Sequence, residues 1–133
     1  MLEDITVNVR LKLALLWTSF MFLYIYVDYL HFYMPNSLED MLAGRVFLFD
    51  VTQVFLLASL VSVTIPALMI FLSAVLPANV SRWANIVVAI IYIPYTLFNL
   101  AGEAWIHMMF GAAVEVVLLL LIIRSAWTWP RLA

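Results

Sequence analysis

Residues 103–127, EAWIHMMFGAAVEVVLLLLIIRSAW, form a long apolar run with a carboxylate, Glu115, in its middle. A helix needs about 20 largely apolar residues to cross a bilayer, so this run is long enough to span a membrane. A carboxylate inside the hydrocarbon region costs roughly 2.5 kcal/mol or more unless it meets a partner or water. Glu115 is therefore a candidate functional residue. Asp28, which lies in the first apolar run of the chain, is another for the same reason.

The composition of the whole chain agrees with a membrane protein. Of the 133 residues, 68% are hydrophobic and 11% are charged, whereas soluble globular domains have about 25% charged residues. The length predicts one integral membrane domain, residues 1–133, with four spanning helices and short connections. We expect the spans at residues 11–34, 51–76, 82–100 and 103–127. The predicted fold class is all-α, a four-helix transmembrane bundle.

Several kinds of chemistry are disfavoured by the sequence. The chain has no cysteine, so disulfides, thiolate nucleophiles and thiolate-bound metals are ruled out. There is no nucleophile triad, no glycine-rich phosphate loop and no basic patch for nucleic acid. We therefore expect no enzymatic activity, no cofactor and no nucleic-acid partner.

Local signals mark the ends of the predicted helices. Ser37–Asp40 has the spacing of a capping box and predicts a short interfacial helix after the first span. Asp50 and Gln53 are spaced to cap the second span, which Pro66 should kink. Ser81 is expected to cap the third span.

The basic residues predict the orientation in the membrane. Lysine and arginine concentrate on the cytoplasmic side of membrane proteins. Five of the six lie on the side that holds both termini, and Arg45 alone lies on the other. Both termini should therefore be cytoplasmic and the short interfacial helix external. The five are Arg10, Lys12, Arg82, Arg124 and Arg131.

Helical spacing gathers the hydrogen-bonding residues of each span on one face. Residues three and four apart share a helix face, and in lipid a polar face should point into the bundle. At about 1.5 Å rise per residue, Asp28 lies near the external end and Glu115 near the midplane. We predict a polar cavity that opens outward and narrows toward Glu115. Its candidate lining residues are Asp28, Glu115, His31, His107, Tyr24, Tyr92, Tyr95, Asn99 and Glu103.

Structural roles stay open for several of these residues. Asp28 could hold the helices in register through a hydrogen bond to a tyrosine or to His107, and a structural role is also open for Glu115. Glu103 lies in the first turn of its predicted helix, where the helix dipole stabilises a carboxylate. His31 and His107 could each simply be solvated at the membrane interface.

Two redox or metal alternatives use the histidines. Asp28 and His31 on one span could face Glu103 and His107 on another and hold Zn, Mn or Fe. His31 and His107 could instead hold haem b near the external face. The spacing permits both sites without being diagnostic of either.

A resemblance to a known family rests on the segments Leu16–Ser19, Tyr24–Tyr29, Ile65–Met69, Phe71–Ser73, Asn85–Ile86 and Ala126–Pro130. They resemble a family of small prokaryotic four-helix integral membrane proteins of unknown function. The resemblance covers most of the chain, and Asp28, Pro66 and Glu115 match its pattern. Val27 replaces a small glycine, and the stretch from Gly102 to His107 departs from the family motif. The resemblance implies the fold and a location in the prokaryotic cytoplasmic membrane, but no activity.

The expected function is therefore that of a non-enzymatic multi-pass membrane protein. It would bind or conduct a proton, a cation or a small polar solute in the cavity around Asp28 and Glu115. Conduction favours a homo-oligomer, because four spans rarely enclose a complete pathway. The alternatives are a structural or accessory membrane subunit, and a metal- or haem-dependent redox protein. The partners that this implies are the lipid bilayer, further copies of the chain in a homo-oligomer, and a small ion or solute whose identity the sequence does not give.

Overall fold

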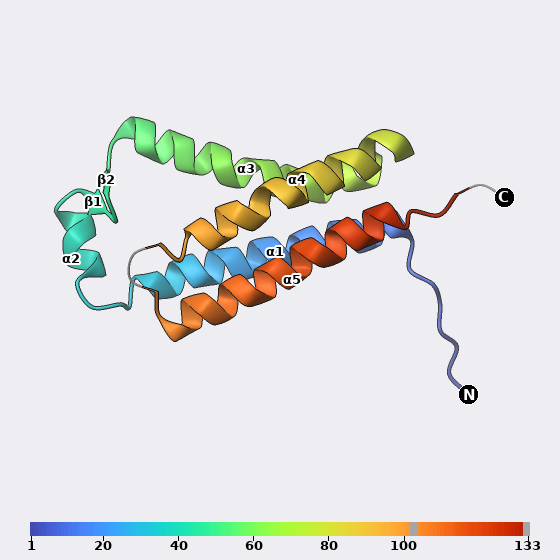
Figure 1. The fold of residues 1–133 in the computed structure, drawn as a ribbon, viewed down its shortest axis with the longest axis horizontal. Helices are drawn as coiled ribbons and strands as arrows, with labels where there is room; N and C mark the ends of the chain where they lie inside the picture. Colours follow the sequence, from blue (N-terminus) through green and yellow to red (C-terminus); the bar gives the residue numbers. More distant parts are fainter. Residues whose placement is uncertain (102–103, 132–133) are drawn as a thin grey trace.

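Four long helices run back and forth along a common axis in the computed structural model, which describes residues 1–101 and 104–131 (Figure 1). Each of the four is long and apolar enough to cross a membrane, as the sequence predicts. A short helix and a β-hairpin, whose two strands have two residues each, connect the first two of them. The elements are α1 (Val9–His31), α2 (Ser37–Leu42), β1 (Arg45–Val46), β2 (Phe49–Asp50), α3 (Gln53–Val75), α4 (Ala78–Phe98) and α5 (Ile106–Trp127).

The two ends of the bundle carry different parts of the chain. Both termini and the turn between α3 and α4 lie at one end, which we call the terminal end (Figure 1). The short helix α2 and the hairpin lie at the opposite end, which we call the loop end. The predicted mostly helical fold with four candidate spans is thus confirmed. The hairpin was not predicted from the sequence.

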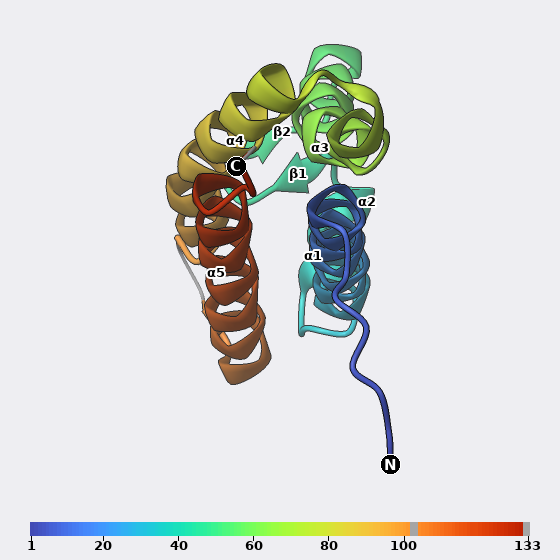
Figure 2. The ribbon, with the colours of Figure 1, turned by 90° about the vertical axis from the view of Figure 1, so that its right-hand side faces the viewer.

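Viewed along its axis, the bundle has α1 and α4 on a diagonal (Figure 2). α1 packs against α3 and α5, and α4 packs against the same two helices. Large side chains fill the centre between them, because each helix turns its bulkiest buried residues inward. The core includes Leu13, Trp17, Phe20, Met69, Ile86, Leu119 and Ile122.

The first two connections differ in detail from the predicted caps. Asn36, with φ 68°, precedes α2, so Ser37 is the first helical residue and its predicted capping box does not form. The hydroxyl of Thr52 caps α3 by accepting the Phe55 N–H at 3.1 Å. Asp50 instead forms an ion pair with Arg45 at 2.9 Å across the hairpin, because the two residues are cross-strand neighbours.

The third long helix begins earlier than predicted. α4 starts at Ala78, directly after Pro77, whose fixed φ suits the start of a helix. Ser81 therefore lies inside the first turns rather than at the cap. Its hydroxyl donates to the main-chain carbonyl of Ser73 at 3.1 Å, and so links α4 to α3.

Pro66 lies inside α3 and is buried, and α4 compensates for its missing N–H. A proline cannot donate to the carbonyl four residues before it, which here belongs to Ser62. The hydroxyl of Tyr92 donates to that carbonyl. The hydroxyls of Ser62 and Tyr95 also hydrogen-bond to each other at 2.7 Å. The helix defect and its repair thus tie α3 to α4 halfway along their length.

Two arginines bind the last carbonyls of neighbouring helices at the terminal end. Arg10 of α1 donates to the carbonyl of Leu76 at 2.5 Å, just after α3. Arg82 of α4 donates to the carbonyls of Ala126 and Trp127 at 3.1 and 3.2 Å, at the end of α5. Helix C-termini have unsatisfied carbonyls and partial negative charge, so a cation there is stabilising. Two of the residues that predict orientation therefore also hold the bundle together.

Candidate functional site

The two candidate carboxylates lie on neighbouring helices. Glu115 on α5 is buried, with 4% of its surface exposed, whereas Asp28 on α1 is exposed. Their charges are within electrostatic reach of each other. Within residues 1–101 and 104–131, no side chain forms a hydrogen bond or an ion pair with either carboxyl. The site therefore holds two acidic groups without a compensating cation.

A close approach of α1 and α5 fixes the level of Glu115 relative to α1. A Cβ atom added to Gly111 would lie 2.6 Å from the Cγ2 atom of Val27, so the two helices nearly touch there. Asp28 is the next residue of α1. Glu115 lies four residues, about 6 Å of helix rise, closer to the terminal end than Gly111. The small residue Gly111 thus allows α1 and α5 to pack closely within the chain.

The level of Glu115 relative to α4 follows from the arginine contact at the terminal end. Arg82 binds the carbonyl of Ala126, and α4 and α5 are consecutive antiparallel helices with the same rise per residue. Counting forward along α4 from Arg82 to Tyr92 covers the same number of residues as counting back along α5 from Ala126 to Val116. Tyr92 and Val116 are therefore level with each other. Glu115 is therefore level with Tyr92, in the middle of the bundle.

Aromatic and polar residues of α1 and α4 meet across the diagonal of the bundle. The rings of Tyr24 and Tyr95 are stacked with centroids 6.2 Å apart, and Tyr92 and Tyr95 lie 5.1 Å apart. The side-chain amide of Asn99 donates to the hydroxyl of Tyr24. The structure thus brings together the four predicted residues of this group. The hydroxyl of Tyr24 thus has the Asn99 amide as its partner, and the hydroxyls of Tyr92 and Tyr95 are hydrogen-bonded to Ser62.

The two histidines do not share an environment. The Nε2 atom of His31 lies 3.5 Å from the hydroxyl of Ser37, at the start of α2. His107 meets the ring of Trp105 edge-on at 6.2 Å, and its own Nε2 atom is buried without a hydrogen-bond partner.

The metal alternative gains no support from the part of the chain that the structure describes. No group of three or more His, Asp or Glu side chains there is placed to hold a metal ion. Asp28, His31 and His107 are within that part, whereas the fourth member of the set, Glu103, lies outside the described residues. The haem site with His31 and His107 stays a prediction.

The half of the core nearer the termini is closed. Trp17 donates to the side-chain oxygen of Asn85 at 2.6 Å, and Ser73 donates to the same oxygen at 3.1 Å. The amide nitrogen of Asn85 donates to the carbonyl of Ser81 at 2.7 Å. All four side chains are fully buried. Together with the apolar core around them, this paired cluster separates Glu115 from the terminal end.

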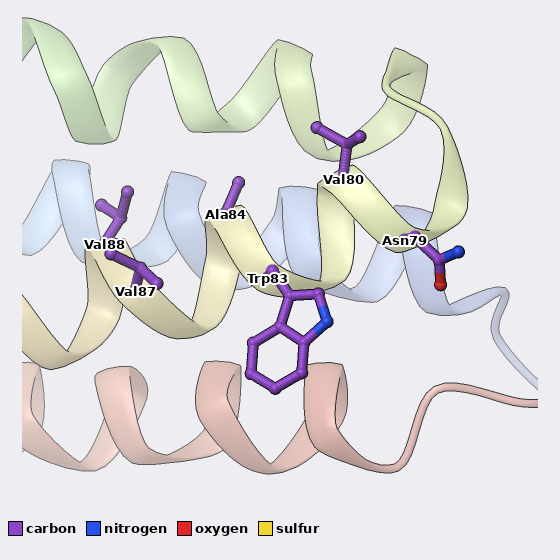
Figure 3. Close-up of a pocket in the computed structure, with 6 residues that line it drawn as sticks. All are labelled: Asn79, Val80, Trp83, Ala84, Val87 and Val88. Atoms are coloured by element: carbon purple, nitrogen blue, oxygen red, sulfur yellow. The ribbon is translucent and has the colours of Figure 1, made fainter.

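Two hollows in the described surface lie away from the carboxylates. One, of about 570 Å³, is lined by α4 residues near the terminal end (Figure 3). Val80, Ala84 and Val88 point toward α3 there, while Trp83 points toward α5. The other, of about 410 Å³, lies between residues 6–10 and Trp129–Pro130. Both are walled largely by apolar atoms. The polar cavity that the sequence predicts around Asp28 and Glu115 stays a prediction.

Sequence reasoning missed Asn85 and Thr96 as interior polar residues. Ser81, Asn85, Ala89, Tyr92 and Thr96 are all buried along one face of α4. They recur every three or four residues, so extending the predicted stripe of Tyr92 backward would have found Asn85. Thr96 is one turn beyond Tyr92 and would have followed from the same spacing.

Comparison with known proteins identifies the family of this chain but no activity. The model of a family of unknown function, DUF6326, matches residues 4–133, which is nearly the whole chain. No curated protein and no solved structure matches the chain. The function must therefore be argued from the site.

Proposed function

Because this chain belongs to the DUF6326 family of unknown function and has the four apolar helices of a multi-pass membrane protein, we propose its function from the site. The chain binds or conducts a proton, a cation or a small polar solute through the interior around Asp28 and Glu115. It does so without enzymatic activity or a bound cofactor. Its place is the cytoplasmic membrane of a prokaryote, with both termini inside.

One observation carries this proposal: Glu115 is buried in the middle of a spanning helix with no partner on any described side chain. A carboxylate in that position is expensive unless something binds it. Asp28 adds a second acidic group within electrostatic reach and is itself exposed. Two neighbouring acidic groups that no lysine or arginine among the described residues pairs favour a positively charged occupant and disfavour anions.

The direction of access follows from the closed half of the core. The cluster of Asn85 with its three partners, all paired and fully buried, blocks the route from Glu115 to the terminal end. Asp28 lies on the loop-end side of Glu115 and is exposed. An occupant would therefore enter from the loop end. Transport across the membrane would need a second arrangement in which the terminal half opens, or an assembly of several chains.

The test is flux into proteoliposomes made with wild type, Asp28→Asn and Glu115→Gln. Protons, Na⁺ and K⁺ are offered separately, and the expected result is flux of one species that either substitution lowers. Asp40→Asn is the matched control, because Asp40 is an exposed carboxylate on α2 outside the spanning helices. Equal flux in all four proteins would contradict the proposal.

A structural or accessory role is the second candidate, and the exposure of Asp28 favours it. An exposed carboxylate within a candidate spanning helix would gain from a partner chain that covers it. In that case Asp28→Asn would leave flux unchanged while altering the oligomeric state or the thermal stability. Size measurement in detergent alongside the flux assay separates the two roles.

A further inference from the structure

Two buried polar atoms in the loop-end half of the bundle have no hydrogen-bond partner among the described residues. One is the hydroxyl of Thr96 on α4, a residue with 1% of its surface exposed. The other is the Nε2 atom of His107 on α5. More than nine in ten buried polar groups in proteins are hydrogen-bonded, so an unpartnered one calls for an explanation. Both atoms lie in the same half of the bundle as Asp28.

The register of α4 and α5 places Thr96 close to Glu115. Arg82 of α4 binds the carbonyl of Ala126 of α5, which fixes the relative level of the two helices. Counting forward from Arg82 to Thr96 covers the same number of residues as counting back from Ala126 to Ala112. Thr96 is therefore level with Ala112, which is three residues, or about 4.5 Å of helix rise, from Glu115.

The directions of the side chains bring these two groups closer still. Helix side chains lean toward the N-terminus of their own helix. The N-terminus of α5 is at the loop end, so Glu115 leans toward the level of Thr96. The N-terminus of α4 is at the terminal end, so Thr96 leans toward Glu115. The two side chains therefore lean toward each other from neighbouring helices, and no hydrogen bond joins them. His107 lies two turns from Glu115 toward the loop end, on the same face of α5.

We infer that Glu115, Thr96 and His107 are joined by water molecules into one relay, and that the occupant of the site is a proton. This inference rests on the proposed function and narrows its occupant. A water between Thr96 and Glu115 would give both groups the hydrogen bond that no side chain supplies. In transfer, the water donates one proton to a Glu115 carboxylate oxygen and takes another from the next group of the relay. One O–H bond forms at Glu115 for each that breaks at the water.

The packing around Glu115 favours a proton over a metal cation. Metal cations such as Ca²⁺ take 6–8 oxygen ligands in proteins. The hydroxyls of Tyr24 and Tyr92, at the level of Glu115, are already bonded to Asn99 and Ser62. Between α1 and α5, the contact of Val27 with Gly111 leaves no room for an added methyl group one turn above Glu115.

The titratable groups around this site are few. They come from α1, α4 and α5, whereas α3, Gln53–Val75, has no titratable side chain. Two carboxylates on neighbouring helices with one free hydroxyl fall short of the ligand set of a metal cation, whereas one carboxylate suffices for a proton. The titratable groups that face Glu115 or flank it are Asp28 and Tyr24 on α1, Tyr92 and Tyr95 on α4, and His107 on α5.

The test removes one hydroxyl and keeps the shape of the side chain, in Thr96→Val. Thr64→Val is the matched control, because the exposed Thr64 already donates to the carbonyl of Leu60 at 2.6 Å within its own helix. The first readout is the infrared carbonyl band of the Glu115 carboxylic acid, identified as the band that Glu115→Gln removes. We expect Thr96→Val to move this band to higher frequency and Thr64→Val to leave it in place. We also expect Thr96→Val to lower proton flux about tenfold, the effect of one lost hydrogen bond.

Thermal stability separates a relay from a merely structural hydroxyl. Thr96→Val removes a hydroxyl that bonds no described side chain, so no direct hydrogen bond between helices is lost and the variant should keep the stability of wild type. Lower proton flux in a protein of undiminished stability therefore supports the relay. An unmoved infrared band with unchanged flux in Thr96→Val overturns it.

The remaining outcomes distinguish this inference from the proposed function. Flux of Na⁺ or K⁺ without proton flux overturns the relay and leaves the proposed function standing. A shifted band without flux of any species supports the relay and restricts the site to binding. An unmoved band without flux of any species contradicts both.

Discussion

The hydroxyl of Tyr92 on α4 donates to the main-chain carbonyl of Ser62 on α3, the acceptor that Pro66 leaves without a helical donor. An unsatisfied carbonyl is costly in a membrane, where water does not replace the missing donor. A side chain of one helix thus repairs a defect in the backbone of another, at the level where Glu115 is buried.

This relationship predicts that the effect of Tyr92→Phe depends on Pro66. In wild type, Tyr92→Phe should lower the free energy of unfolding by about 1 kcal/mol. In a Pro66→Ala background, Tyr92→Phe should lower the free energy of unfolding by much less than this. The reason is that residue 66 then donates its own N–H to the carbonyl of Ser62. Reversible unfolding in mixed micelles of the four proteins measures the coupling. Tyr95→Phe is the control, since Tyr95 bonds the hydroxyl of Ser62 and not its carbonyl; equal losses of Tyr92→Phe in both backgrounds would contradict the prediction.

Asn85 should be the most sensitive polar residue of the closed half. Its side-chain oxygen accepts from Trp17 and Ser73, and its amide donates to Ser81. Asn85→Ala leaves the buried donors of Trp17 on α1 and Ser73 on α3 unpaired, so we expect a loss of about 2 kcal/mol or more in unfolding free energy. Trp17→Phe changes the core packing but leaves Asn85 bonded to Ser73. The control is Asn79→Ala on the same helix, where the asparagine is exposed and the change should be within about 0.5 kcal/mol.

Gly111 should tolerate a methyl group only if Val27 is made smaller. A Cβ at Gly111 would lie 2.6 Å from Val27 Cγ2, and valine has little rotamer freedom to move away. We expect Gly111→Ala to destabilise by about 1–3 kcal/mol through overpacking. Adding Val27→Ala should restore part of that loss. Thermal unfolding of both single variants and the double variant measures this, and a double variant no more stable than Gly111→Ala would refute the contact.

The orientation in the membrane can be tested with single cysteines, because the chain has none of its own. Asp40→Cys lies on α2 at the loop end, and Asn79→Cys lies at the start of α4 at the terminal end. Both sites are exposed. With both termini inside, a membrane-impermeant maleimide added to intact cells should label residue 40 and not residue 79. The reverse pattern would overturn the orientation drawn from the basic residues.

Much of the fold could be predicted because its signal is local. A run of about 20 apolar residues marks a spanning helix without reference to the rest of the chain. The same argument singled out Asp28 and Glu115, since a charge in such a run stands out whatever its neighbours are. The caps were predicted less well, because Asp50 and Ser81 had competing partners, Arg45 and Ser73, that only the folded chain supplies.

By itself, the sequence determined the membrane class, the four helices and the identity of the acidic residues, since hydropathy and helical spacing act within one segment. Only the tertiary structure decided which polar groups are paired. Trp17 bonds Asn85, Tyr92 bonds Ser62, and Glu115 and Thr96 have no partner among the described side chains. These pairings join residues 30 to 68 positions apart. They depend on which helix faces meet and at what register, and both follow from packing contacts such as that of Val27 with Gly111.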